Sequence, residues 1–233
     1  VKNGGLVTLD GAVTPTLFTG VNIGTGGATS SGKLVIDGAG SLLQLSGGQG
    51  FIQVGANVAG SVGELQITGG GRVAGVGETG LATMLIGRDG ATGTVTVSSN
   101  DAVGNASTLR IAGRDSVSGG GAFVNIGGLS NSGKPGTGTV NILAGGRFEV
   151  DTSALVTNAG RPGSFIGVGQ GASGTLNISG KSALTGAAST WAITGGSGVT
   201  PLVSVGRDGA TGSAIVSAGG RWLISSTHAS TTN

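Results

Sequence analysis

The acidic and basic residues of this chain are few, and their spacing gives little chemistry. Asp and Glu total 10, Lys and Arg total 12, and there is one His among 233 residues. Cleavage of a glycosidic bond needs two carboxylates about 5 to 10 Å apart. Asp89 and Asp208 follow Arg88 and Arg207 in two near-identical segments, but these segments lie three sequence repeats apart, about 14 Å if repeats stack at strand spacing. We interpret both as Asp-Gly turns rather than as a catalytic pair.

Other catalytic and metal-binding patterns are absent from the sequence. His228 stands alone in a Ser/Thr-rich stretch, 225–233, which we expect to be a flexible tail. The Gly-Gly pairs have no Asp at the offset that calcium-binding nonapeptide repeats require. There is no cysteine, which excludes disulfides and thiolate sites. The sequence therefore predicts no catalytic residue, no cofactor and no metal site, and we expect the protein not to be an enzyme.

The strongest pattern is a phrase of short apolar steps that recurs six times. Each phrase contains an apolar-x-apolar-Gly step, then a Gly/Ser/Thr turn, then a second apolar-x-apolar step and a third, weaker segment such as Gly145-Gly146-Arg147-Phe148. The first steps end at the glycines that we expect to turn the chain, namely Gly24, Gly55, Gly87, Gly127, Gly169 and Gly206. Repetition at this period is typical of solenoid proteins.

Within each step, apolar and polar residues alternate, which is the period of a β-strand with one buried face. Short strands of this kind bury their inner face only when successive repeats stack. The sequence predicts an all-β protein, a parallel β-helix with three short strands per coil and about six coils. The interior should contain Ile23, Ile36, Val54, Ile67, Ile86, Val97, Ile126, Ile142, Val168, Ile178, Val205 and Val216.

Composition excludes several classes of partner. Only 9% of the residues are charged, and the formal net charge of +2 is spread along the chain. Nucleic-acid binding requires a clustered basic surface, which we do not find. No apolar stretch reaches the roughly 18 to 20 residues of a membrane-spanning segment, so we expect no direct membrane insertion.

The repeats differ in the length of their connections. Extra residues fall in segments 98–107, 128–137, 151–163 and 181–189, between the expected strands. Insertions that leave a coil intact become protruding loops, which often form the binding surface of repeat proteins. If the chain recognises a glycan or a host-surface ligand, we expect loops 98–107, 128–137 and 151–163 to contact it; drift in loop length is the alternative interpretation.

The segment from Ile86 to Val97 and its near copy from Val205 to Val216 resemble the autotransporter (type V secretion)/PEP-CTERM-associated repeat. The run Gly186-Ala187-Ala188-Ser189-Thr190-Trp191 is similar to the same family's pattern of a glycine-rich turn followed by Ser-x-Trp. This resemblance implies a β-helical passenger region of a large bacterial surface or secreted protein. Neither a translocating barrel nor a sorting signal is found in the sequence.

Two functions from different classes follow from this interpretation. The first is a non-catalytic structural or adhesive stalk, extracellular or on the bacterial cell surface, formed by residues 1–233 as one repeat domain and a segment of a longer chain. The second is a self-assembling extracellular fibre or surface-layer-like component, in which rods associate end to end because both ends expose unpaired strand edges.

Overall fold

A computed structural model describes residues 1–11, 18–77, 81–113, 121–128, 133–154, 163–196 and 201–226, and in this part of the chain all regular structure is β. The strands are β1 (Leu6–Asp10), β2 (Phe18–Thr25), β3 (Ser31–Asp37), β4 (Leu42–Ser46), β5 (Gln49–Ala56), β6 (Val62–Thr68), β7 (Arg72–Gly77), β8 (Leu81–Arg88), β9 (Thr92–Ser98), β10 (Thr108–Gly113), β11 (Gly121–Gly128), β12 (Thr137–Leu143), β13 (Arg147–Thr152), β14 (Gly163–Val168), β15 (Ser173–Ser179), β16 (Thr190–Gly195), β17 (Leu202–Arg207), β18 (Thr211–Ser217) and β19 (Arg221–Ser226).

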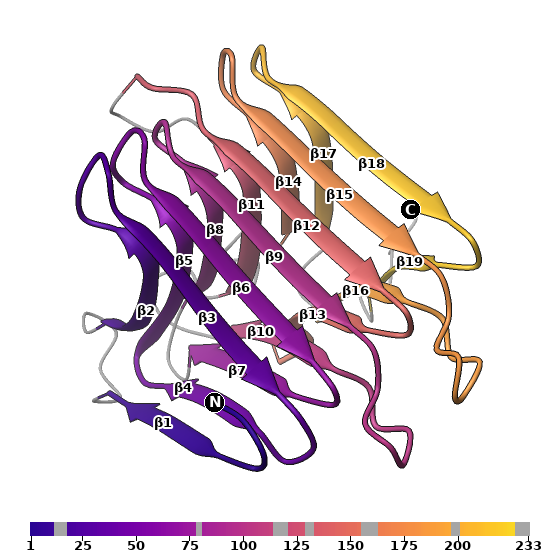
Figure 1. The fold of residues 1–233 in the computed structure, drawn as a ribbon. Helices are drawn as coiled ribbons and strands as arrows, with labels where there is room; N and C mark the ends of the chain where they lie inside the picture. Colours follow the sequence, from indigo (N-terminus) through magenta and orange to yellow (C-terminus); the bar gives the residue numbers. More distant parts are fainter. Residues whose placement is uncertain are drawn as a thin grey trace.

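Every third strand pairs in parallel, so that the chain winds into a solenoid with three sheets (Figure 1). We call them the first sheet (β2, β5, β8, β11, β14, β17), the second sheet (β3, β6, β9, β12, β15, β18) and the third sheet (β1, β4, β7, β10, β13, β16, β19). Each coil takes one strand from each sheet in this order, and β1 precedes the first coil. The predicted parallel β-helix with three strands per coil is confirmed.

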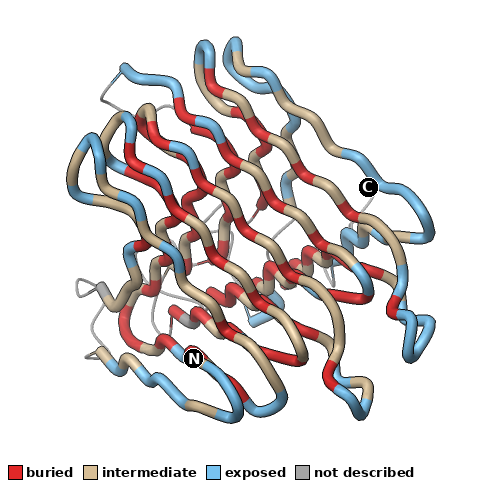
Figure 2. Tube along the Cα trace, in the orientation of Figure 1, coloured by how far each residue is buried: buried red, intermediate tan, exposed pale blue. Residues whose placement is uncertain are grey.

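The interior is a continuous apolar column between the three sheets. Figure 2 marks the buried residues in red, and they recur along the strands of every sheet. Most of the predicted core residues are buried there, namely Ile23, Ile36, Val54, Ile67, Ile86, Val97, Ile126, Ile142 and Ile178. Residues that alternate with them point outward, as the pleat of a strand requires. Stacking therefore buries the face that no single coil could bury.

Three predicted core residues are placed differently. Val205 and Val216 occupy interior columns, opposite Ile166 and Ile178, but they are 45% and 46% exposed. Their strands, β17 and β18, are edge strands of the described sheets, so one side of each residue has no neighbouring coil. Val168 is only half-buried, because it lies at the corner beyond the interior position, which Ile166 fills.

Two columns of glycine meet at the corner between the first and second sheets. The turn glycines Gly24, Gly55, Gly87, Gly127 and Gly206 have φ angles between +56° and +71°, which favours glycine. The facing column is Gly32, Gly63, Gly93, Gly138, Gly174 and Gly212. A Cβ atom on Gly138 would lie 2.2 Å from the Gly127 backbone nitrogen, so the backbones approach too closely for any side chain.

In the fifth coil Gly167 occupies the corner column, whereas the predicted turn glycine, Gly169, lies in the same connection. Gly167 has φ +73° and faces Gly174, as Gly127 faces Gly138. Gly169 also has a positive φ, but it lies two residues further along the connection. A shift of two residues leaves the inward and outward faces of a strand unchanged, so hydrophobic alternation could not distinguish the two alignments.

The third sheet contributes the two largest buried side chains. Phe148 of β13 and Trp191 of β16 are stacked in register, with ring centroids 4.3 Å apart, and both are fully buried. Trp222 of β19 continues this column and is half-buried. Ser225 and Ser226 of the expected tail belong to β19, whereas residues 227–233, His228 included, lie outside the described residues.

Candidate binding groove

The segment 98–107 forms a short hairpin that protrudes beyond the corner between the second and third sheets (Figure 1). Asn100 and Ala106 make an antiparallel bridge at its base. Residues 129–132 and 155–162, in two of the other segments expected to protrude, lie outside the described residues. The fourth expected segment, 181–189, forms a second hairpin, closed by a bridge between Lys181 and Ala188.

Asp101 holds the first hairpin together. Its Oδ1 accepts hydrogen bonds from the backbone nitrogens of Val103 (3.0 Å) and Asn105 (2.8 Å), and its Oδ2 accepts one from Asn105 Nδ2 (2.7 Å). The side-chain hydrogen bond from Asn105, together with those from the backbone, lowers the pKa of the Asp101 carboxyl. The ionised carboxylate of Asp101 therefore fixes the conformation of the hairpin, which we call the wall.

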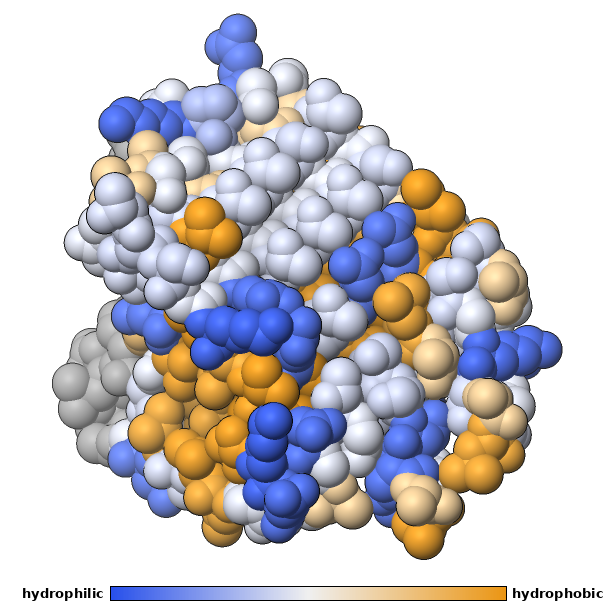
Figure 3. Space-filling view, in the orientation of Figure 1, coloured by the Kyte–Doolittle hydropathy of each residue, from blue (hydrophilic) through white to orange (hydrophobic). Residues whose placement is uncertain are grey.

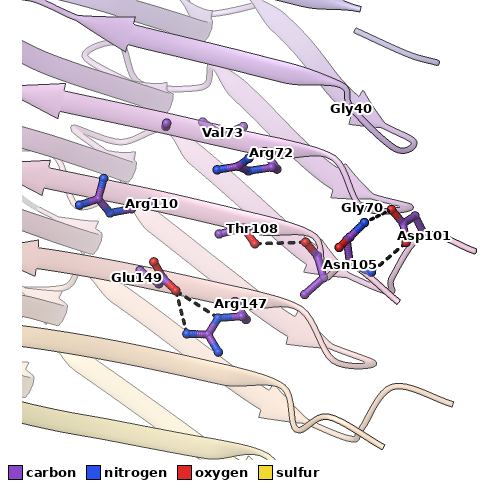
Figure 4. Close-up of a pocket in the computed structure, with 12 residues that line it drawn as sticks. Gly40, Gly70, Arg72, Val73, Asp101, Asn105, Thr108, Arg110, Arg147 and Glu149 are labelled. Atoms are coloured by element: carbon purple, nitrogen blue, oxygen red, sulfur yellow. Dashed lines mark hydrogen bonds and ion pairs between the residues drawn. The ribbon is translucent and has the colours of Figure 1, made fainter. Parts of the chain in front are cut away.

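This wall borders a groove on the outer face of the third sheet, with a volume of about 600 Å³ (Figure 4). The turns at Gly40 and Gly70 line the groove at the same corner, on the two preceding coils (Figure 4). The groove is further lined by Asn105 and Ala106 of the hairpin and by residues of β7, β10 and β13, namely Arg72, Val73, Ala74, Thr108, Arg110, Arg147 and Glu149.

The groove follows from the register of three strands. Thr108 lies between Arg72 and Arg147 in one outward column, and Arg110 lies between Ala74 and Glu149 in the next. Because Ala74 and Thr108 are small, the floor is low, and the longer side chains around them rise above it. Two rungs separate Arg72 from Arg147, about 10 Å at strand spacing.

The guanidinium groups differ in their partners. Arg110 Nη2 donates to Asp151 Oδ2 at 2.5 Å. Arg147 donates to Glu149 Oε1 from Nε at 3.1 Å and from Nη2 at 2.8 Å. Among the described residues, the Arg72 side chain has neither a hydrogen bond nor an ion pair, and it is exposed. The groove thus has one unpaired cation and two that are held in place.

Two acids, Glu149 and Asp151, alternate on the outer face of β13 beside the groove. Burial alone would raise the pKa of Asp151, but hydrogen bonds from Ser153 and the ion pair with Arg110 outweigh it and lower the pKa. A glycosidase needs one carboxyl group with a raised pKa to protonate the leaving oxygen. The pKa of Asp151 is lowered, so Asp151 does not suit this role.

Sequence reasoning missed this groove because it examined outward positions only in the first two strands of each repeat. The third strand has the weakest motif, so its outward residues could not be aligned between coils. The Gly-Gly-Arg triplets at Arg72, Arg147 and Arg221 were a usable signal, since these arginines occupy one outward column of the third sheet.

The outer face of the second sheet has a different character. Hydroxyl side chains occupy two adjacent outward columns on four successive coils, seen as pale rows in Figure 3. They are Thr92, Thr94, Thr137, Thr139, Ser173, Thr175, Thr211 and Ser213. Beside them Asn177 Nδ2 donates to Asn141 Oδ1 at 2.9 Å, an amide ladder across coils. This stretch has no charged side chain.

A smaller hollow of about 270 Å³ lies between the two hairpins. Ala102 and Leu184 line it from opposite sides, and Ala144 of the intervening coil forms its floor. Leu184 is 61% exposed and Val103 is 83% exposed.

No helix of the described residues is long and apolar enough to cross a membrane. These residues also contain no group of three or more His, Cys, Asp or Glu side chains placed to hold a metal ion. Comparison with family models, with curated proteins and with solved structures found no match to this chain. The resemblance to the autotransporter-associated repeat therefore stays a prediction.

Proposed function

We propose that this chain is a non-catalytic β-helical shaft of a secreted or cell-surface bacterial protein, and that it recognises ligands along its side. The observation that supports the proposal most is the single interior column, which runs through all six coils. A fold of this kind is rigid along its axis, because each coil is hydrogen-bonded and packed against its neighbours. Its corner glycines and inward residues serve stacking alone.

The groove supports the adhesive part of the proposal. The hairpin that borders it lies in segment 98–107, one of the three segments expected to contact a ligand. Its acids are held by arginines or by the hairpin itself, so they serve structure and recognition rather than proton transfer. The resemblance to a bacterial passenger repeat agrees with an extracellular location.

Two measurements test this function. Incubation with a panel of bacterial and plant polysaccharides should release no new reducing ends, and an antibody against the chain should label intact cells of the bacterium that encodes it. Release of reducing ends that disappears in a Glu149→Gln variant would show an enzyme instead. Labelling only after cell lysis would contradict the proposed location.

A second function, end-to-end assembly, is favoured by the last described coil. Val205, Val216 and Ile224 are 45%, 46% and 53% exposed, whereas Ile166, Ile178 and Ile193, at the same positions one coil earlier, are at most 1% exposed. Interior residues on strands whose outer edge pairs with no described strand form a surface that a further coil covers, either one of this polypeptide or the first coil of a second copy.

Electron microscopy of the purified chain distinguishes the two functions. End-to-end assembly predicts filaments of coaxial rods that shorten when Val216→Lys places a charge on the exposed end. Single rods at all protein concentrations would exclude end-to-end assembly and would agree with the shaft function.

A further inference from the structure

We propose that the groove over β7, β10 and β13 binds a carboxylate-bearing polysaccharide, with Arg72 as its principal anion contact. This inference deepens the proposed adhesive function by naming the site and the class of ligand, and it rests on the chain being a binding protein.

The first argument is the charge of the groove. Its lining contributes three guanidinium groups and the carboxylates of Asp101 and Glu149. The Asp101 carboxylate is occupied by three donors of its own hairpin. Asp151, just outside the lining, balances Arg110, and Glu149 balances Arg147. Asp101 keeps its negative charge, so these groups sum to no net charge, but among the described residues Arg72 is the one cation of the lining without an acidic partner, and a ligand anion would supply that partner.

The second argument is the orientation of the paired arginines. A guanidinium has five N–H donors in a planar fork. Asp151 accepts from one nitrogen of Arg110, and Glu149 accepts from two nitrogens of Arg147. Within the described part of the chain, the remaining N–H groups of both side chains have no further acceptor and can donate to ligand hydroxyl and carboxylate oxygens. Because their acid partners fix these side chains, little conformational entropy is lost on binding.

The third argument concerns the kind of polymer. A neutral sugar chain is commonly held by stacking on aromatic rings, but no aromatic side chain is among the residues that line the groove. Phe148 and Trp191 of the third sheet point into the core. The groove instead offers cations on successive coils, with Arg72 and Arg147 about 10 Å apart. A polymer with carboxylates on its sugar units meets both, whereas a small anion meets one.

The test uses the whole chain and two acidic polymers, polygalacturonate and alginate, each paired with its methyl-esterified form. Esterification removes the charge and keeps the sugar, so the pair isolates the carboxylate. Calorimetry at low and moderate salt should show binding of at least one acidic polymer, at least tenfold weaker binding of its ester, and weaker binding at the higher salt concentration.

Two variants locate the site. Arg72→Gln should weaken binding about fivefold to tenfold, the loss of one charge-assisted contact. Arg221→Gln is the matched control, because Arg221 lies in the same outward column but outside the groove, and it should bind like the original chain. Both variants should keep the same circular dichroism spectrum.

Several results would overturn the proposal: no binding of either acidic polymer by the folded chain, equal binding of acid and ester, or equal losses in the two arginine variants. Cleavage of a bound polymer would overturn the non-catalytic function and leave the binding site standing. If the chain neither binds nor cleaves the polymers, the proposed binding site is refuted and the proposed structural function is not.

Discussion

The outer faces of the second and third sheets are built on one interior and yet differ in chemistry. Beyond the Lys33–Glu64 ion pair of its first two coils, the second sheet shows rows of hydroxyls such as Thr94, Thr139 and Thr175, with no charge between them. The third sheet shows Arg72, Arg110 and Glu149 around a hollow. Inward residues of both sheets are equally buried and apolar.

This difference shows that, within each coil, one set of residues determines stacking and another set determines the chemistry of the outer surface. Inward columns and corner glycines determine stacking, because they touch the neighbouring coil on both sides. Outward columns touch mainly solvent, so they are free to differ between faces without cost to the fold. Recognition therefore depends on the outward residues, and each prediction below disturbs either the shared scaffold or one face.

The largest effect is expected at a corner glycine. In Gly127→Ala, the new Cβ would lie 1.9 Å from the backbone oxygen of Ser173 in the next coil, at φ +71°. We expect a loss of about 5 kcal/mol or more in the free energy of unfolding, measured with urea. Gly206→Ala is the control: its φ is +67°, but the nearest atom is 3.4 Å away. It should lose only about 1 to 2 kcal/mol, and equal losses would contradict stacking as the cause.

The next effect concerns the aromatic column inside the third sheet. Trp191→Ala should lower the free energy of unfolding by about 3 to 5 kcal/mol, because it leaves a cavity against Phe148. Trp222→Ala should cost distinctly less, since Trp222 is covered by a coil on one side only. The two variants are compared by thermal and urea unfolding, and a larger loss for Trp222 would refute the assigned register.

A smaller effect depends on pH. The pKa of Asp101 is lower in the folded protein than the value of about 3.9 in an unfolded chain. Ionised Asp101 therefore contributes stability above pH about 4, and this contribution is lost as the pH falls through the folded pKa. Thermal unfolding between pH 2 and 7 should show this loss in the original chain and a weaker loss in Asp101→Asn. If the variant shows the same pH profile as the original chain, ionised Asp101 does not stabilise the hairpin.

The smallest effect is expected on the hydroxyl face. Thr139→Lys adds a charge at an outward position of β12 and should change the free energy of unfolding by less than about 0.5 kcal/mol. It should also leave polymer binding in the groove of the third sheet unchanged. A loss of more than about 2 kcal/mol would show that outward columns take part in stacking after all.

The fold was predictable because stacking imposes a pattern that each coil repeats. Ile126 and Ile142 show it plainly, since each is an inward residue of a strand with apolar–polar alternation, and Gly127 is the glycine at the corner between the two strands. Gly167 was not predictable, because the pattern Ile-Gly-Val-Gly satisfies two alignments with the same inward face. The groove escaped prediction for another reason: Ala74, Thr108 and Arg110 form it only through the register of β7, β10 and β13, which their own sequences do not specify.

The central claim, that coils stack in parallel with a fixed register, is tested most directly by engineered disulfides. The chain has no cysteine, so any cross-link comes from the introduced pair. Thr139 and Thr175 are opposite each other on neighbouring coils, whereas Thr94 and Thr175 are two coils apart. Strand spacing of about 4.8 Å is within reach of a disulfide, and twice that distance is not. The account predicts rapid oxidation of Thr139→Cys with Thr175→Cys and none of Thr94→Cys with Thr175→Cys; equal cross-linking of both pairs, or of neither, would contradict it.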